Sequence, residues 1–168
     1  LVNWCPSSRS AISDEEVIHK EISGNLWYFK YPIEKDKSFL VVATTRPETL
    51  LGDTAIAVNP EDERYAHLVG SYANIPIVDR KVPIIADEHV DPKFGTGCVK
   101  VTPAHDPNDF EIGKRHGLKF INIMNDDASL NENVPQDFQG LSREKARKEV
   151  IKRMNLKNLL EKTEDHIN

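Results

Sequence analysis

Short runs of β-branched and aromatic residues, separated by polar turns, dominate the hydrophobic pattern of this chain. Runs of this kind predict strands, and the polar turns at 34–37 and 79–81 each predict a hairpin between two of them. The predicted strands cover residues 26–31, 38–45, 55–58, 75–78, 82–85, 97–102 and 120–123.

Three segments carry helix signals. Segments 60–68 and 107–116 each begin at a proline and are followed within two residues by a glycine, as helices often are. Segment 141–154 is basic, and Ser142 is its expected N-cap. Many short strands with few helices predict an α+β domain built on a β-barrel with peripheral helices.

Length and composition fit one ordinary domain. The 168 residues are enough for a core, and no run of about 18 apolar residues is present that could span a membrane. The chain begins with Leu1 and has no signal-peptide pattern, so we expect a piece of a longer protein. Cys5 and Cys98 form no metal or disulfide pattern, which predicts a reducing, cytoplasmic location and two small buried side chains.

Charge and missing motifs argue against several classes of protein. The formal net charge is −5, whereas a domain that grips nucleic acid along its backbone is usually basic. If RNA is a partner, we therefore expect contact with only a few nucleotides. The chain has no glycine-rich phosphate loop and no regular βαβ alternation, which argues against a dinucleotide-binding or kinase-like domain. It has no Gly-x-Ser-x-Gly elbow or Cys/His pair to indicate a protein nucleophile.

The first segment that could carry chemistry is Thr44-Thr45-Arg46-Pro47-Glu48-Thr49, directly after a predicted buried strand. Hydroxyls, a cation and a carboxylate at a strand exit are suited to line a cleft. A purely structural interpretation stays open, because Thr45 with Glu48 also matches a capping box.

The second segment runs from Gly95 to Asp109. Lys100 and Thr102 share one strand face because side chains alternate, and Asp106 and Asp109 share one helix face because they are three apart. These four side chains are expected around one small volume, which suits a ligand with an ammonium group. Asp106 is also a good N-cap and Asp109 favours the helix dipole, so capping and binding both remain open.

A metal interpretation has less support. His105, Asp106 and Asp109 resemble a His/Asp cluster, but hydrolytic metal sites usually need more histidines. The other histidines are scattered without ligand spacing. We therefore predict no metal.

The two segments, in this order, resemble the editing domain inserted into class I aminoacyl-tRNA synthetases for valine, isoleucine and leucine. Residues 43–49 with Leu51-Gly52-Asp53-Thr54 resemble the threonine-rich editing segment of that family. Residues 95–109, followed by Gly113, resemble its second editing segment.

Within the family, the valyl branch is the most similar. Isoleucyl enzymes usually have His where this chain has Lys100, and the runs 59–65 and 84–88 also resemble the valyl pattern. The resemblance implies a tether from the parent catalytic domain over residues 1–24 and a single editing domain over residues 25–168.

The resemblance also implies the residues of an amino-acid pocket. Asp109 is expected to pair with the α-ammonium of the substrate, while other polar side chains read a hydroxyl or line the pocket near the ester. The expected hydroxyl readers are Lys100, Thr102 and Asp106, and the expected lining residues are Thr45 and Thr49.

The tRNA end is expected to contact a further set of side chains. Arg46 and Phe94 are expected to hold the terminal nucleotides, with Phe94 stacking on a base. Asp91 is expected to touch a ribose. The basic residues of segment 141–154 could contact the RNA backbone, although the interleaved acidic residues favour a solvated helix face.

The implied activity is proofreading hydrolysis of threonyl-tRNA(Val), an aminoacyl-tRNA ester, without a cofactor in this domain. The expected partners are the 3′ end of misacylated tRNA and the rest of the synthetase in cis, which would use ATP and Mg. No ligase activity is expected from the chain itself, which has neither ATP-binding signature of class I synthetases. We expect a monomer. The alternatives are isoleucyl-type editing of valyl-tRNA(Ile), an RNA-end binding module without hydrolysis, and a metal hydrolase.

Overall fold

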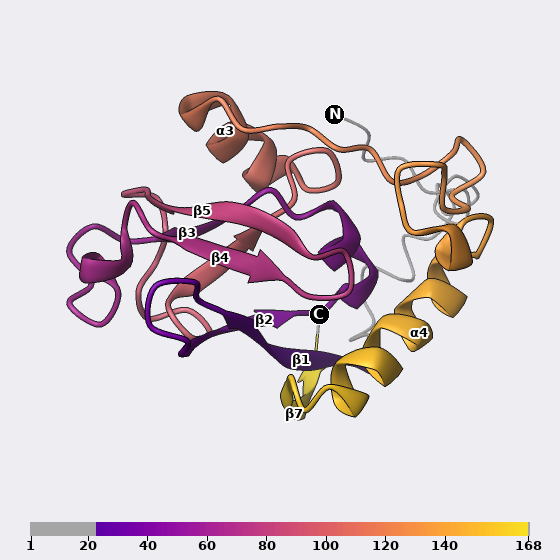
Figure 1. The fold of residues 1–168 in the computed structure, drawn as a ribbon, viewed down its shortest axis with the longest axis horizontal. Helices are drawn as coiled ribbons and strands as arrows, with labels where there is room; N and C mark the ends of the chain where they lie inside the picture. Colours follow the sequence, from indigo (N-terminus) through magenta and orange to yellow (C-terminus); the bar gives the residue numbers. More distant parts are fainter. Residues whose placement is uncertain (1–22, 168) are drawn as a thin grey trace.

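The strands of the computed structural model, which describes residues 23–167, lie in two sheets (Figure 1). In the first sheet, β1 (Ser23–Pro32) is central and pairs antiparallel with both neighbours. These neighbours are β2 (Phe39–Thr44) and β7 (Leu160–Ile167). Apart from its last two residues, the expected tether over 1–24 lies outside the described residues.

The second sheet has four strands in the order β4-β5-β3-β6. Its only parallel pair is β3 with β5, and the other two pairs are antiparallel. The strands are β3 (Ala55–Val58), β4 (Tyr72–Ile75), β5 (Arg80–Ala86) and β6 (Cys98–Val101).

Both faces of β3 are covered, which explains its uninterrupted apolar sequence. Ile56 and Val58 belong to the main core, which also contains residues of the first sheet. Ala55 and Ala57 point the other way because strand side chains alternate, and they belong to a smaller core with Ile112 of α3 (Pro107–His116). The second sheet is therefore sandwiched between the first sheet and α3 (Figure 1).

The two sheets meet at their edges without closing into one barrel. An isolated antiparallel bridge joins Ile33 to Ala73, and the Cys98 thiol donates to the Val41 carbonyl at 2.9 Å. The hydroxyl of Thr96 donates to the same carbonyl. The predicted α+β class is confirmed, and the described strands form two open sheets in place of the expected barrel.

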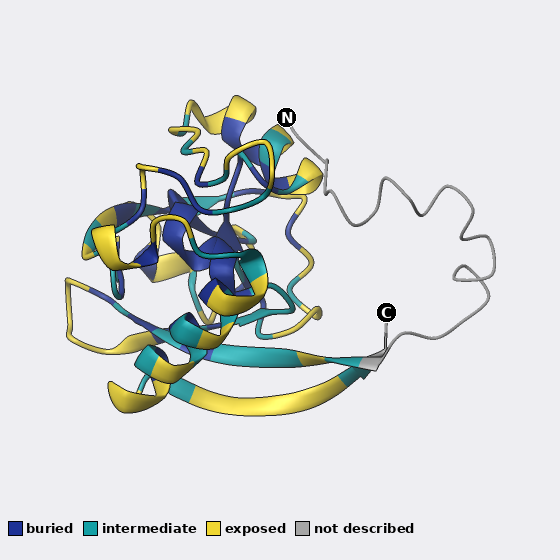
Figure 2. Ribbon diagram, turned by 90° about the vertical axis from the view of Figure 1, so that its right-hand side faces the viewer, coloured by how far each residue is buried: buried dark blue, intermediate teal, exposed yellow. Residues whose placement is uncertain are grey.

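A second helix, α4 (Arg143–Leu156), packs beside the end of the first sheet and buries Ala146, Val150 and Met154 (Figures 1 and 2). Its predicted N-cap is confirmed, because the Ser142 hydroxyl accepts from the Lys145 amide. Three short 3-10 helices complete the regular structure of the described residues. They are η2 (Pro47–Gly52), η3 (Ala66–Leu68) and η4 (Gln136–Phe138). No described helix is long and apolar enough to cross a bilayer.

The helix predicted over 60–68 is wrong, apart from η3 at its end. Asp62 accepts from the Arg64 amide at 3.1 Å, a backbone donor that the helix would use, and Asn59 holds a turn before it by accepting from the Glu61 amide at 2.8 Å. Short polar side chains of this kind compete with helix formation and favour turns. The helix predicted over 107–116 is confirmed, with Gly117 in the left-handed conformation after it.

The strand predicted over 120–123 is also wrong, for a similar reason. The Ile123 amide donates to the His105 ring at 2.9 Å, and the Asn122 carbonyl accepts from the side chains of Asn131 and Asn133 at 2.8 Å. These backbone groups are satisfied by side chains, so no partner strand is needed.

Two further differences concern strands. The hairpin around 79–81 exists, but β4 ends at Ile75 because the chain turns there, with left-handed backbone at Ile77 and Asp79. Strand β7 was not predicted, since its sequence is mostly polar and its side chains are largely exposed at the sheet edge.

An ion pair ties α4 to η2. The Glu48 carboxylate is fully buried and accepts two hydrogen bonds from Arg147, at 2.8 and 3.0 Å. On the same helix Arg153 pairs with Glu149 and Asp137. Two cations of the basic helix are thus engaged within the domain, which supports a structural role for them.

We predict that Arg147→Met lowers the free energy of unfolding by about 3 kcal/mol, because it removes both hydrogen bonds to the buried Glu48 carboxylate and leaves only the Arg46 guanidinium, at 4.0 Å, as its cation. Lys148→Met is the matched control, since Lys148 is exposed on the same helix. Urea unfolding of the two variants measures the difference. Equal stability of both variants would show that the ion pair contributes nothing.

Candidate functional site

The two sequence segments meet where β6 ends and α3 begins. The Thr102 amide, one residue beyond β6, donates to Asp109 Oδ2 at 2.9 Å. Asp106 caps α3 by accepting from the Asn108 and Asp109 amides at 2.8 and 3.1 Å, as the sequence predicted. Strand exit and helix start are therefore held together by Asp109 itself.

The Lys100 ammonium is 7% exposed and lies among three oxygen atoms. Its Nζ donates to Thr49 Oγ1 at 2.7 Å and to Thr102 Oγ1 at 2.9 Å, and it lies 2.8 Å from Asp53 Oδ1. Because Lys100 is paired across the sheet with Ile56 of the main core, its charge requires these partners. We call Asp53, Lys100, Thr49 and Thr102 the Lys100 cluster.

Asp53 is the member whose role the sequence did not predict, although it stands in the Leu51-Gly52-Asp53-Thr54 motif. Its carboxylate is fully buried and accepts from the hydroxyls of Thr102 at 2.5 Å and Tyr31 at 2.6 Å. Burial raises the pKa of Asp53, while the Lys100 ammonium and the two hydroxyls oppose that rise. An acidic residue two positions before the uninterrupted apolar run of β3 was the available sequence signal for Asp53.

Two local features hold the backbone at Asp53. Arg80 donates to the carbonyls of Asp53 at 2.7 Å and Leu51 at 3.2 Å. Gly52 lies so close to Thr102 that an added Cβ would come within 3.2 Å of the threonine methyl. The end of η2 is thus pressed against the end of β6.

The first segment faces the same region. Thr49 is buried and donates to the Arg46 carbonyl at 2.8 Å, and Arg46 donates to the His105 carbonyl at 2.8 Å. The capping box proposed for Thr45 and Glu48 is wrong: η2 has no side-chain cap, and the Glu48 carboxylate pairs with the guanidinium of α4. Thr45 is half-buried beside this segment.

The side-chain carboxyl of Asp109 is a weaker acid than an ordinary aspartate. Burial, followed by repulsion from Asp106, raises the pKa of Asp109 to about 7, although the Thr102 amide and the Lys100 ammonium oppose the change. A buried carboxyl whose pKa lies near neutrality marks this junction as a candidate functional site.

His105 lies at the same junction and is buried. Burial, followed by repulsion from Arg46 and Lys100, lowers its pKa to about 4. Its Nε2 accepts from the Ile123 amide, so the neutral ring carries its proton on Nδ1. His105 is thus a neutral structural link between the site and the segment at 123.

Phe94 and Asp91 lie on the loop before β6. The Phe94 ring is 71% exposed, and Asp91 is exposed and caps its own turn by accepting from the Lys93 amide. Among the described residues, neither forms a hydrogen bond or ion pair with the Lys100 cluster. The structure thus unites Lys100, Thr102, Thr49 and Asp109 directly, and leaves these two apart from them.

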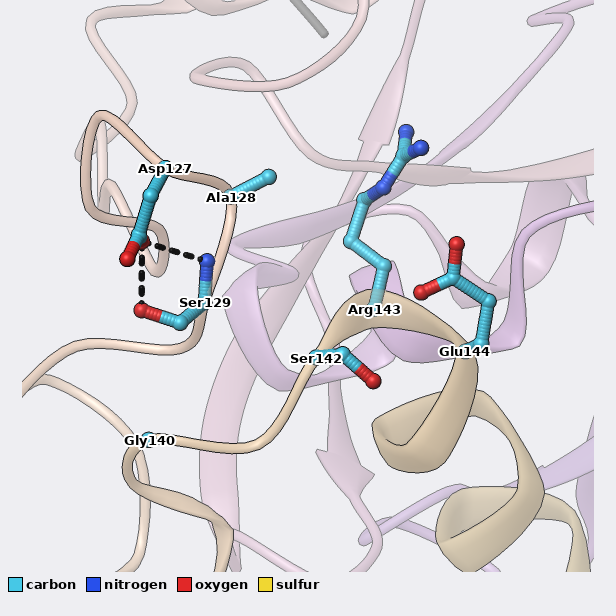
Figure 3. Close-up of a pocket in the computed structure, with 7 residues that line it drawn as sticks. All are labelled: Asp127, Ala128, Ser129, Gly140, Ser142, Arg143 and Glu144. Atoms are coloured by element: carbon cyan, nitrogen blue, oxygen red, sulfur yellow. Dashed lines mark hydrogen bonds between the residues drawn. The ribbon is translucent and has the colours of Figure 1, made fainter. Parts of the chain in front are cut away.

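A surface hollow of about 330 Å³ lies elsewhere, between the turn at Asp127–Ser129 and the start of α4 (Figure 3). Arg143 and Glu144 line it, and none of the predicted site residues does. Over residues 23–167, no group of three or more His, Cys, Asp or Glu side chains is arranged to hold a metal ion.

Comparisons with known proteins agree with the two segments. A family model described as "Leucyl-tRNA synthetase, editing domain" matches residues 61–162, more than half of the chain. The valine–tRNA ligases of Synechocystis sp. and Francisella tularensis are 60% and 56% identical to this chain. Each alignment covers 99% of this chain and 18% of the relative, so the chain spans about a fifth of their length.

The fold has a counterpart among solved structures. The crystal structure of the LeuRS–tRNA–LeuAMS ternary complex of Agrobacterium radiobacter matches all of this chain and 22% of that chain, with a TM-score of 0.63 and 21% identity. At this identity the likeness concerns the fold alone. Nearly the full length of this chain is similar to valine–tRNA ligases. The family model matches more than half of the chain, which shows that the chain belongs to the editing-domain family of the leucyl-tRNA synthetase type.

Proposed function

We propose that this domain hydrolyses the ester bond of threonyl-tRNA(Val), and so removes a wrong amino acid from the 3′ end of transfer RNA. The observation that supports this most is the position of Asp109. Its buried carboxylate lies next to Lys100 and Thr102, and so offers a partner for an α-ammonium beside groups that can bond a side-chain hydroxyl.

Such an activity answers a physical problem. Valine and threonine have nearly the same shape, so a hydrophobic pocket built for valine cannot strongly reject threonine. This pair of amino acids is a standard example of the limited selectivity of a hydrophobic pocket. A second site must require the hydroxyl. Leaving one buried polar group unsatisfied costs about 1–3 kcal/mol, which corresponds to roughly a 5- to 150-fold preference.

The residues divide by role. Asp109 binds the α-ammonium, and Thr45 with Thr49 lies beside the ester. Lys100, Thr102 and Asp106 recognise the side-chain hydroxyl, directly or through one another. No side chain of this set is an obvious general base, so orientation of a water molecule beside the ester supplies most of the rate. The reaction needs neither a metal ion nor a covalent intermediate.

The tRNA end is held at the rim of the site. Arg46 is half-buried between the site and the surface, and the exposed Phe94 ring offers a face on which a terminal base can stack. Asp91, on the same loop, is proposed to contact a ribose. The solved ternary complex of a related fold contains tRNA, which agrees with a tRNA end as the ligand of this fold.

Editing of valyl-tRNA(Ile) is the second candidate, as in the isoleucyl branch. Lys100 favours the threonyl substrate, because a buried ammonium with two threonine hydroxyls is a poor environment for the apolar side chain of valine. We further propose that the domain acts in cis with the rest of a valine–tRNA ligase, which carries the ligase activity.

Asp109→Asn is expected to reduce deacylation of threonyl-tRNA(Val) by at least 100-fold, because the variant has no charge for the α-ammonium. The fold is expected to survive, since the Asn carbonyl still accepts from the Thr102 amide. Glu111→Gln is the matched control, because Glu111 is exposed on α3. Full activity of the Asp109 variant in the deacylation assay would refute its assignment.

The raised pKa of Asp109 predicts the pH dependence. The folded chain binds this proton more tightly than the unfolded chain, so its contribution to stability is present below about pH 4 and is lost as the pH rises through about 7. Asp109→Asn should therefore gain stability relative to the parent between pH 4 and pH 8. The kcat/KM of the parent should rise as the pH increases to about 7 and then level off. A stability difference that does not change with pH would contradict the raised pKa.

Substrate and metal dependence separate the alternatives. Threonyl-tRNA(Val) is expected to be deacylated at least 10-fold faster than valyl-tRNA(Ile), and a chelator is expected to leave the rate unchanged. Binding without hydrolysis would indicate an RNA-end recognition module. Loss of the rate in chelator, with recovery on adding Zn²⁺, would indicate a metal hydrolase.

A further inference from the structure

The protons of the Lys100 ammonium are all engaged within the protein. An ammonium has three donors and no acceptor. The three oxygen atoms around Nζ belong to Thr49 at 2.7 Å, Thr102 at 2.9 Å and Asp53 at 2.8 Å. Lys100 therefore has no proton to offer a ligand unless one of these bonds breaks.

The two threonine hydroxyls are committed in the same way. Each hydroxyl has one proton and two acceptor lone pairs. Thr49 donates its proton to the Arg46 carbonyl at 2.8 Å, and Thr102 donates its proton to Asp53 Oδ1 at 2.5 Å. Each hydroxyl also accepts from Lys100, so what each retains is one acceptor position.

Asp53 sets this direction. A carboxylate only accepts, and the Lys100 ammonium only donates, so the Thr102 hydroxyl between them can point its proton only toward Asp53. The other carboxylate oxygen accepts from Tyr31 at 2.6 Å, which fixes the orientation of the carboxylate plane. All four members are at most 7% exposed, so the hydrogen bonds among them are shielded from bulk water.

We propose that Asp53 is a positioning residue for substrate selection, which directs the protons of the Lys100 cluster inward so that the cluster recognises a substrate side chain by accepting a hydrogen bond from it. This inference rests on the proposed function. It predicts that the site selects the proton of the threonine hydroxyl and not merely its oxygen or its size.

Substrate analogues test this on the unaltered chain. The tRNA is charged with threonine, with 2-aminobutyrate, which lacks the hydroxyl, or with 2-amino-3-fluorobutyrate, in which fluorine replaces it and cannot donate. Threonine should be deacylated roughly 5- to 150-fold faster than either analogue, and the two analogues should react alike within about threefold. A fluoro analogue that reacts as fast as threonine would overturn the inference.

A pair of variants at position 53 tests the residue itself. Asp53→Asn keeps an acceptor toward Lys100 and Thr102 and can turn its amide N–H group toward the Tyr31 oxygen, so the preference for threonine over the fluoro analogue should stay within about threefold. Asp53→Ala releases the Thr102 proton, so that preference should fall by about 10-fold or more. Tyr31→Phe is the stability control, because it removes a buried bond to Asp53 without touching Lys100 or Thr102.

The outcomes separate the two proposals. If the parent chain hydrolyses none of the esters, the proposed function and this inference both fail. If the parent hydrolyses threonyl-tRNA(Val) but Asp53→Ala keeps its preference, the function stands and the role of Asp53 is refuted. Loss of the preference for threonine in Asp53→Asn as well would also refute the positioning role of Asp53, because the charge at position 53 and not the hydrogen-bond direction would then set the preference. Should Asp53→Ala fail to fold, the analogue series on the parent decides whether the site reads the proton of the hydroxyl, and Asp53→Asn decides whether charge or hydrogen-bond direction sets the preference.

Discussion

The buried ion pair between Asp53 and Lys100 is the constraint on which the rest of the site depends. Neither charge could remain in the interior alone, because an unpaired buried charge is far more costly than a paired one. The pair forces the end of η2 and the strand β6 to lie against each other, and it recruits Thr49 and Thr102 as further ligands of the ammonium. The main core can therefore end in a polar cluster without an unsatisfied ion.

The surrounding structure holds this cluster from several sides. Arg80 fixes the backbone at Asp53, and Arg147 fixes η2 through Glu48. On the far side of the second sheet, Asp87 accepts from Arg115 and His116 at the end of α3. Although burial opposes it, hydrogen bonds from the His89 amide and these side chains lower the pKa of Asp87 to about 2. The helix that carries Asp109 is thus anchored at both of its ends.

Much of the fold followed from local signals. Alternating and β-branched runs predicted β1, β2, β3, β5 and β6, and proline and glycine marked α3, because these signals depend on neighbours in sequence. The run at 75–78 was three residues late for β4, and the polar strand β7 was missed. The two elements that were predicted and do not form lie where side chains capture the backbone. Asn59 and Asp62 replaced a helix with turns, and His105 took the amide that a strand would have used.

The site was predicted in part for the same reason. Alternation along β6 and the three-residue spacing on α3 were enough to unite Lys100, Thr102 and Asp109. Asp53 was missed as a partner because its contact with Lys100 joins segments that lie far apart in sequence, and no local pattern encodes that pairing. The raised pKa of Asp109 likewise depends on burial by the whole fold.

A crystal structure with a non-hydrolysable threonyl-adenosine analogue, in which an amide replaces the ester, tests the central claim most directly. The account predicts that the α-ammonium lies within hydrogen-bond distance of Asp109, and that the threonine hydroxyl points its proton at an oxygen of the Lys100 cluster. An analogue bound away from both, for example in the hollow beside Arg143, would contradict it.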